Sequence, residues 1–460
     1  MKGLYTAVAA AAIFPAVLAK PSKTFNKRAD TSVTGSLPTV TTKGNAFMAG
    51  DDRFYIRGVD YQPGGSSDLA DPIADVDGCR RDVAKFQELG INTIRVYTID
   101  NSADHDECMS MLDDAGIYLA LDVNTPDYSI NRADPHRSYN DVYLQNVFAT
   151  VDKFVGYSNT LLFFSANEVI NDNLTTNCAP YVKATTRDIK QYIHERGYRK
   201  VPVGYSAADV DSNRYEMASY MNCGSDDERS DFFAFNDYSW CDPSSFTQSG
   251  WDQKVEQYSN YSIPLFLSEF GCTTNTREFN EIASLYSDDM TPVYSGGLVY
   301  EYSNEDNGFG LVEITGSSVR ELDDFSTLKD ALAATEPPSG DGGARLDNPG
   351  PASECPAQSD VWDVEENTLP NLPEPAQRYF DDGAGDGPGL DGDGSQTAGT
   401  ASESDSDIGS GGDSTSEEGE ASTSTGAATS VRVPEFSVGV APLVCAGMVL
   451  ASSLFGAALV

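Results

Sequence analysis

Two apolar segments of this chain each end on a glutamate. Leu161–Asn167 leads into Glu168, and Pro264–Ser268 leads into Glu269. A short, continuous apolar run is typical of a fully buried strand. A carboxylate at the end of such a strand is desolvated, which costs free energy, so its presence suggests a function. Paired carboxylates, one protonated as general acid and one ionised as nucleophile or base, are the groups that act on glycosidic bonds. The two glutamates therefore predict glycosidic chemistry.

The neighbours of the two glutamates suggest separate roles. Glu168 follows Asn167, whose amide can bind a sugar hydroxyl. Tyr238 or Tyr302 could donate a hydrogen bond that keeps Glu269 ionised. We therefore assign Glu168 as acid/base and Glu269 as nucleophile. The alternative is structural: one glutamate only pairs with Arg57 or Arg95 inside the fold.

Eight apolar runs must position these groups, and amphipathic stretches such as Cys79–Leu89, Asn140–Phe154 and Tyr181–Arg196 separate several of them. Alternating strands and helices of this number indicate an α/β fold, a closed (β/α)₈ TIM barrel. Gly64-Gly65 does not fit a dinucleotide-binding G-x-G-x-x-G loop, which argues against an open doubly wound sheet. The runs are Phe54–Tyr61, Thr93–Ile99, Tyr118–Asn124, Leu161–Glu168, Val201–Asp209, Phe232–Trp240, Pro264–Gly271 and Gly296–Ser303.

In such a barrel, functional groups lie at the C-terminal ends of the strands. Glu168 and Glu269 end the fourth and seventh runs, so both are expected on one face. Carbohydrate sites combine aromatic faces with planar polar groups. Tyr128, Tyr139 and Tyr143, which we place in loops, are expected to be sugar platforms rather than core residues.

The two ends of the chain carry targeting signals. Residues 1–19 read as a signal peptide, and 20–336 as the catalytic barrel. A linker and a short extension packed on the barrel follow at 337–380. Residues 381–426 form an acidic Ser/Gly-rich stalk expected to be disordered, and 427–460 a GPI-attachment propeptide. Gly426 is the expected attachment site, with Ser424 next, and a C-terminal transmembrane helix is the alternative.

Composition narrows the class of function. A net charge of −41 excludes a nucleic-acid partner, because phosphate binding needs clustered Lys and Arg. Eight cysteines in a secreted chain should mostly form disulfides. With three histidines and no C-x-x-C motif, we expect no metal and no cofactor. Asn173 and Asn260 lie in glycosylation sequons.

Seven motifs in order give the chain a resemblance to the fungal GPI-anchored β-1,3-glucanosyltransferases of glycoside hydrolase family 72, over roughly residues 35 to 380. They are Arg57-Gly-Val-Asp-Tyr-Gln-Pro-Gly-Gly65, Arg95-Val-Tyr-Thr-Ile-Asp100, Leu121-Asp-Val-Asn124, Asn167-Glu-Val169, Tyr181-Val-Lys-Ala184, Leu267-Ser-Glu-Phe-Gly271 and Val299-Tyr-Glu-Tyr-Ser303. The resemblance implies an enzyme that cleaves β-1,3-glucan internally and transfers the new reducing end to the non-reducing end of another chain.

The resemblance also implies roles for particular residues. It makes Glu168 the acid/base and Glu269 the nucleophile, and it proposes disulfides Cys79–Cys108, Cys241–Cys272 and Cys223–Cys355. The state of Cys178 stays open. With only Cys355 between the barrel and the propeptide, the chain is similar to the subgroup without a Cys-rich carbohydrate-binding module. The donor sugar would be held by Gln62, Tyr97, Asp122, Asn167 and Tyr238, with Tyr302 as a further expected contact.

Three functions remain open at this point. The leading one is the transferase, acting as a monomer on β-1,3-glucan donor and acceptor chains outside the plasma membrane. The second is a retaining endo-β-1,3-glucanase, which uses the same carboxylates with water as acceptor. The third is a wall-anchored protein that binds glucan without catalysis.

Overall fold

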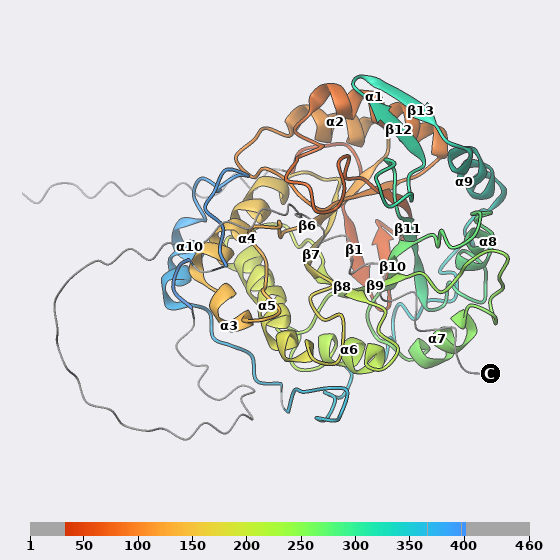
Figure 1. The fold of residues 1–460 in the computed structure, drawn as a ribbon. Helices are drawn as coiled ribbons and strands as arrows, with labels where there is room; N and C mark the ends of the chain where they lie inside the picture. Colours follow the sequence, from red (N-terminus) through yellow and green to blue (C-terminus); the bar gives the residue numbers. More distant parts are fainter. Residues whose placement is uncertain (1–32, 366, 397, 402–460) are drawn as a thin grey trace, which may run out of the picture. The chain divides into compact units, whose positions relative to one another are not determined.

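Eight parallel strands close into a barrel, which confirms the predicted fold class (Figure 1). The computed structural model describes residues 33–401 except 366 and 397. Six strands fall within one of the eight apolar runs, while β7 and β11 begin shortly before theirs, at Thr160 and Tyr294. Around the barrel they are β4 (Ile56–Asp60), β5 (Thr93–Val96), β6 (Tyr118–Asp122), β7 (Thr160–Asn167), β8 (Val203–Ala208), β9 (Phe232–Asp237), β10 (Leu265–Phe270) and β11 (Tyr294–Val299).

Helices connect successive strands on the outside of the barrel (Figure 1). Asn140 illustrates how they begin: its side chain accepts a hydrogen bond from the Tyr143 N–H and so caps α4. The helices are α1 (Val76–Leu89), α2 (Asp106–Asp114), α3 (Pro135–Ser138), α4 (Asp141–Phe154), the 3₁₀ turn η1 (Thr176–Cys178), α5 (Ala179–Glu195), α6 (Arg214–Met221), α7 (Trp251–Tyr258), α8 (Glu281–Leu285) and α9 (Asp323–Ala334).

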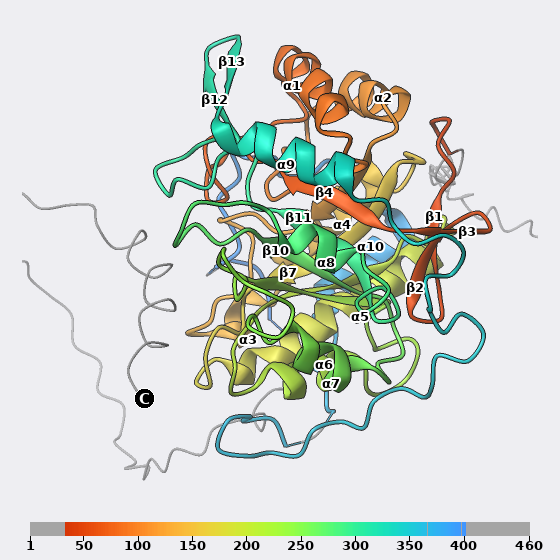
Figure 2. The same ribbon diagram turned by 90° about the vertical axis from the view of Figure 1, so that its right-hand side faces the viewer.

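A small antiparallel sheet closes one end of the barrel. It consists of β1 (Val40–Lys43), β2 (Ala46–Ala49) and β3 (Asp52–Phe54), and Figure 2 shows it at the end opposite the hairpin of β12 (Val312–Thr315) and β13 (Ser318–Glu321). Phe47 of this sheet is fully buried and packs on Phe232 and Phe266 inside the barrel. The interior is therefore a packed apolar core at this end, and a second, larger core lies between strands and helices.

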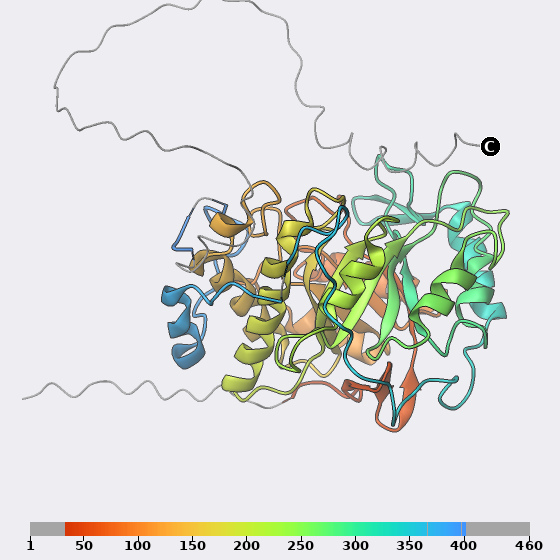
Figure 3. The same ribbon diagram turned by 90° about the horizontal axis from the view of Figure 1, so that it is seen from below.

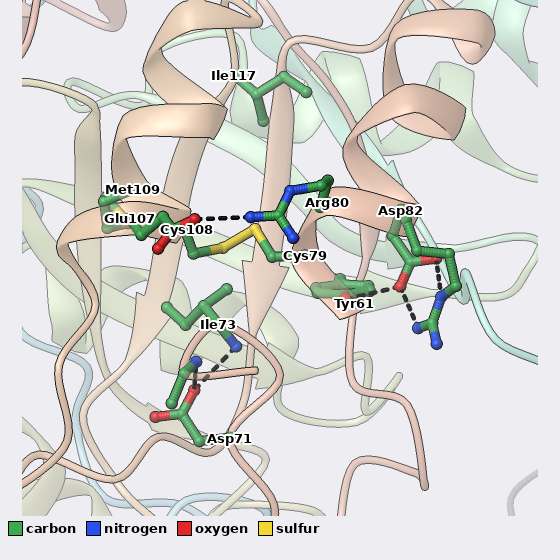
Figure 4. The surroundings of a disulfide bond; sticks show 12 residues. Tyr61, Asp71, Ile73, Cys79, Arg80, Asp82, Glu107, Cys108, Met109 and Ile117 are labelled. Atoms are coloured by element: carbon green, nitrogen blue, oxygen red, sulfur yellow. Dashed lines mark hydrogen bonds and ion pairs between the residues drawn. A yellow bond between two sulfur atoms is a disulfide. The ribbon is translucent and has the colours of Figure 1, made fainter. Parts of the chain in front are cut away.

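Three disulfides are present, with the pairing that the family resemblance implied: Cys79–Cys108, Cys223–Cys355 and Cys241–Cys272. Cys178 is free and buried. Figure 4 shows the first disulfide, which joins α1 to α2 beside an ion pair of Arg80 with Glu107 at 2.7 Å. Covalent and electrostatic links thus hold these two helices together.

The Cys223–Cys355 disulfide attaches the segment that follows the barrel. This segment runs along the outside of the barrel (Figure 3) and ends in η2 (Glu374–Ala376) and α10 (Gln377–Asp382). Trp362 is 1% exposed and packs on Tyr220 at 5.4 Å between ring centres. Lys183 donates to the Cys223 carbonyl at 3.0 Å and also bonds Asn367. The extension is therefore packed on the barrel.

Replacing both Cys223 and Cys355 with serine should lower the free energy of unfolding by about 2–4 kcal/mol, because the disulfide closes a long loop in the unfolded chain. The two cysteines are 132 positions apart. Thermal unfolding of the non-reduced proteins measures the change, and limited proteolysis should show earlier cleavage near Trp362. The Cys178→Ser variant, which breaks no disulfide, is the control. Unchanged unfolding and unchanged cleavage would contradict the prediction.

The chain stays on the barrel well beyond residue 380. We call residues 383–396 and 398–401 the C-terminal strap. The Ala384 N–H donates to the Tyr192 hydroxyl at 3.0 Å, and the Gly389 N–H donates to Asn101 at 2.9 Å. The expectation of a disordered stalk from residue 381 is therefore wrong for these residues. Glycine permits the close approach, since a Cβ at position 392 would lie 2.0 Å from the Tyr128 hydroxyl.

Several expectations lie outside the described residues: the signal peptide at 1–19, the remainder of the stalk, the attachment sites Gly426 and Ser424, and the propeptide at 427–460. Within the part of the chain that the structure describes, no helix is both long and apolar enough to cross a bilayer.

Candidate active site

The barrel brings Glu168 and Glu269 to its C-terminal face. Glu168 follows the last residue of β7, and Glu269 lies near the end of β10. The pairing of β10 with β9 shifts register between Leu267 and Glu269. Such irregularities re-aim a side chain at the end of a strand. The two predicted carboxylates therefore share one face of the barrel.

Glu269 is 7% exposed and accepts hydrogen bonds on both carboxylate oxygens. Tyr97 donates to Oε1 at 2.7 Å, and Tyr238 donates to Oε2 at 2.8 Å. Arg95 lies 3.3 Å from Oε1. Burial raises the pKa of Glu269 to about 7, while Arg95, Tyr97 and Tyr238 act to lower it. Because both oxygens serve as acceptors, this geometry fits the ionised carboxylate that a nucleophile needs.

Glu168 has a different environment. Its side chain is partly exposed, and Asn236 donates to its Oε1 at 2.9 Å. A chain of hydrogen bonds orients the Asn236 amide: the Ser268 hydroxyl donates to Asn236 Oδ1 at 2.8 Å, which leaves Nδ2 to face Glu168. The open side chain and single donor suit a group that exchanges a proton with substrate. Asn236 was absent from our predicted site, although it lies in the sixth apolar run, next to the last residue of β9.

Beneath the carboxylates lies a fully buried cation, Arg95. Its guanidinium binds Asp122 through two nitrogens, at 2.8 and 3.2 Å, and lies over the rings of Tyr97 and Phe164. The expected alternative of a pairing between Glu269 and Arg95 is thus present, but together with the two tyrosine hydroxyls. Arg57 instead donates to the carbonyls of Thr335 and Leu332.

Of the residues expected to hold the donor sugar, Tyr97, Asn167 and Tyr238 lie beside the two glutamates. Asn167 accepts from Ser206 at 2.7 Å, and its amide nitrogen stays available to a ligand. Asp122 is 4% exposed and holds Arg95. Gln62 is 1% exposed; its carbonyl oxygen accepts from the Tyr97 and Thr98 N–H groups. Asp122 and Gln62 therefore support the site from within the protein.

The expectations for four other tyrosines are wrong. Tyr302 is fully buried and donates to Asp82, so it does not reach Glu269. Tyr128, Tyr139 and Tyr143 are 3% exposed or less and belong to the core rather than to sugar platforms. Tyr143 lies on α4 and binds Asn124, while Tyr139 binds Asp188.

Tyr300, rather than Tyr302, lies beside the site, although its hydroxyl bonds Ser66 at 3.4 Å and not Glu269. It is partly exposed, and its ring packs edge-on against Tyr97 and Tyr238. Phe309 completes the aromatic cluster, 5.3 Å from the Tyr300 ring centre. The alternation of the strand breaks down after β11 ends at Val299, so the sequence could not distinguish Tyr300 from Tyr302.

Removing the Tyr238 hydroxyl should shift the pH profile of the enzyme. The hydroxyl lowers the pKa of Glu269, so its loss in Tyr238→Phe raises that pKa and protonates Glu269 at higher pH. The acidic limb of kcat/KM should move upward by roughly one pH unit, the worth of one hydrogen bond to a charged group. The Tyr302→Phe variant is the control, because that hydroxyl binds Asp82. Equal shifts in both variants, or none in Tyr238→Phe, would refute the role.

A closed parallel barrel with two carboxylates in contrasting environments at its C-terminal face belongs to the class of glycoside-processing enzymes. The family profile of the glucanosyltransferases, glycoside hydrolase family 72, matches residues 29–336. The protein belongs to this family.

Individual relatives agree over most of the chain. A 1,3-β-glucanosyltransferase of Aspergillus fumigatus, gel1, is 68% identical over 423 residues, covering 92% of this chain and 93% of that protein. GAS5 of Saccharomyces cerevisiae, also a 1,3-β-glucanosyltransferase, is 54% identical over 364 residues, covering 78% and 75%. Gas2p of Saccharomyces cerevisiae, solved as a Glu-to-Gln mutant with laminaritetraose and laminaripentaose, superposes with a TM-score of 0.69 at 36% identity, covering 74% of this chain and 76% of that one.

Proposed function

We propose that the protein is a retaining β-1,3-glucanosyltransferase that elongates β-1,3-glucan. The observation that supports this most is the contrast between the two glutamates. Glu269 is buried and receives hydrogen bonds on both oxygens, whereas Glu168 is partly exposed with one donor. Family membership supplies the substrate class, since relatives carry the name 1,3-β-glucanosyltransferase.

The first step forms a glycosyl-enzyme. Glu269 attacks the anomeric carbon of a glucose unit inside the donor chain, and the bond from that carbon to the leaving oxygen breaks. Glu168 gives its proton to the leaving oxygen, which departs as the hydroxyl of the released fragment. Arg95, Tyr97 and Tyr238 hold the attacking carboxylate in place, and the Asn167 amide faces the donor sugar.

The second step transfers the glycosyl group. Glu168, now ionised, takes the proton from the non-reducing-end hydroxyl of an acceptor glucan. The acceptor oxygen bonds to the anomeric carbon, and the ester to Glu269 breaks. Each glutamate returns to its starting state. Water in place of the acceptor gives the alternative, a retaining endo-β-1,3-glucanase, so the choice depends on binding of the acceptor chain.

Incubation with a reduced β-1,3-gluco-oligosaccharide of defined length, followed by mass spectrometry, separates the possibilities. Products longer than the donor are expected for a transferase. Shorter products alone would replace the transferase with the hydrolase. Binding of the oligosaccharide without any product would identify a non-catalytic binding protein.

We also propose that the enzyme acts outside the cell, held to the plasma membrane through a GPI lipid at Gly426 and working as a monomer. The signal and anchor patterns of the sequence support this location, and the disulfides suit an oxidising compartment. Asn260, in a glycosylation sequon, is exposed. Release of the protein from fungal membranes by a phosphatidylinositol-specific phospholipase tests the anchor, and retention after treatment would count against it.

A further inference from the structure

Glu168 has an unusual backbone. Its φ of +47° places a residue with a side chain in the left-handed region. Such a conformation costs about 1–3 kcal/mol and persists only where the surroundings hold it. The Glu168 N–H donates to the Ser206 carbonyl at 2.9 Å on one side. The Glu168 carbonyl, on the other side of the residue, also needs a hydrogen-bond partner. When the peptide units on both sides of Glu168 are held, its backbone is fixed, and so is the direction of its carboxylate side chain.

Arg132 supplies that partner. Its guanidinium donates to the Glu168 carbonyl at 2.6 Å and, through Nε, to the Val169 carbonyl at 2.9 Å. Two donors in a planar fork fix two successive peptide units. Arg132 lies in the connection between β6 and α4, residues 123–140, which includes the short helix α3 and which we call the Arg132 loop. The Cys178 thiol donates to the Arg132 carbonyl at 3.6 Å.

The C-terminal strap binds the Arg132 loop at both of its ends. Near the start, the Ser395 N–H donates to the Asp127 carbonyl at 2.9 Å, and Gln396 donates to the Ser129 carbonyl at 2.8 Å. At the far end, Asn140 donates to the Ser395 carbonyl at 2.7 Å. Ser395 is fully buried in this contact. Figure 1 shows the strap in blue beside α10 and α4.

We propose that the C-terminal strap is a positioning element for proton transfer by Glu168. It holds the Arg132 loop, and Arg132 in turn fixes the left-handed backbone of Glu168. The inference rests on the proposed function, in which Glu168 is the acid/base. Arg132 acts through the backbone of Glu168 and without contact with the substrate, so it is a positioning residue. The glycine- and aspartate-rich sequence after α10 is thus part of the catalytic unit.

This role has a chemical signature. Glycosidic bond cleavage in glucan requires a proton on the leaving oxygen, so a displaced Glu168 slows it. A β-laminaribiosyl fluoride donor needs no such proton: its C–F bond breaks, fluoride leaves as the anion, and the new bond forms to Glu269. A positioning defect should therefore slow the glucan donor and spare the first turnover of the fluoride.

Variants in the full chain test the two links separately. Arg132→Met removes both donors, and Arg132→Lys keeps a cation that can still reach the carbonyls. Arg137→Met is the matched control, since Arg137 is an exposed arginine of the same loop. The double variant Ser395→Pro, Gly392→Val detaches the strap. Proline at 395 has no N–H to donate to the Asp127 carbonyl, and valine at 392 adds bulk against the Tyr128 hydroxyl. Circular dichroism and thermal unfolding confirm folding.

For Arg132→Met and the strap variant, we expect kcat on a β-1,3-gluco-oligosaccharide to fall roughly 10- to 100-fold, the cost of a misplaced catalytic group. KM and first-turnover fluoride release should stay near the parental values, and Arg132→Lys should recover part of kcat. Parental kcat in either variant, or equal losses on both donors, would overturn the inference. A parent chain that forms no glycosyl-enzyme from the fluoride would instead overturn the proposed function.

Discussion

Glu269→Gln should lower both cleavage and transfer of β-1,3-glucan by at least about 10⁴-fold, because the glycosyl-enzyme cannot form without the nucleophile. The fold should survive the change. The glutamine can still accept from Tyr97, and Arg95 keeps its two bonds to Asp122. Oligosaccharide products measured by mass spectrometry over a long incubation give the rate.

Glu168→Gln is the matched comparison, since it removes a carboxylate of the same size from the same face. It should lose about 10²- to 10⁴-fold on glucan, the usual contribution of a general acid. It should still release fluoride from β-laminaribiosyl fluoride in a first turnover, whereas Glu269→Gln should not. Fluoride release by Glu269→Gln, or none by Glu168→Gln, would show that the roles are reversed.

Arg95→Met should destabilise the protein by about 3–5 kcal/mol, the effect of removing one partner from a buried ion pair. Arg95 is fully buried, and its loss leaves the Asp122 carboxylate without a counter-ion in the barrel interior. Burial already raises the pKa of Asp122, and Arg95 is the main group that lowers it. Chemical denaturation at pH 7 measures the loss.

Two further variants decide whether the effect is electrostatic. Arg57→Met, at the other end of the barrel, removes an arginine that donates only to backbone carbonyls and should cost much less. Adding Asp122→Asn to Arg95→Met should restore part of the lost stability, since the uncompensated charge is removed. A similar loss for Arg57→Met and Arg95→Met, with no recovery in the double variant, would contradict this explanation.

The barrel and its two carboxylates were predictable because they depend on local patterns. Each apolar run is long enough for one strand. In a parallel barrel all strands end at the same face, so the polar residues that follow these runs lie on that face. Tyr97 and Tyr238 followed from the family resemblance. The roles of Asp122 and Gln62 as internal supports did not, since they depend on Arg95 and on the N–H groups after β5, which are distant in sequence.

The failures share a cause: they depend on geometry that composition does not contain. We placed Tyr143 in a loop although it lies within the amphipathic stretch Asn140–Phe154; the cap at Asn140 begins α4 there, and Tyr143 is buried on that helix. The strap looked disordered because glycine and aspartate dominate it. Single positions decide its packing, such as residue 387, where a Cβ would meet Asn101 at 2.1 Å. The average composition of a sequence window, on which the expectation of disorder was based, does not record the packing of single residues.

The sheet of β1–β3 also constrains the order in which the parts of the barrel can fold during synthesis. Phe47 leaves the ribosome long before Phe232 and Phe266, the two rings against which it packs. Contacts between residues so distant in sequence slow folding, because the chain between them must be ordered first. The earliest part of the barrel domain must therefore wait, with an apolar side chain unburied, until the seventh barrel strand has emerged. Chaperone binding to that segment during synthesis would be one result of placing the closing sheet first in the sequence.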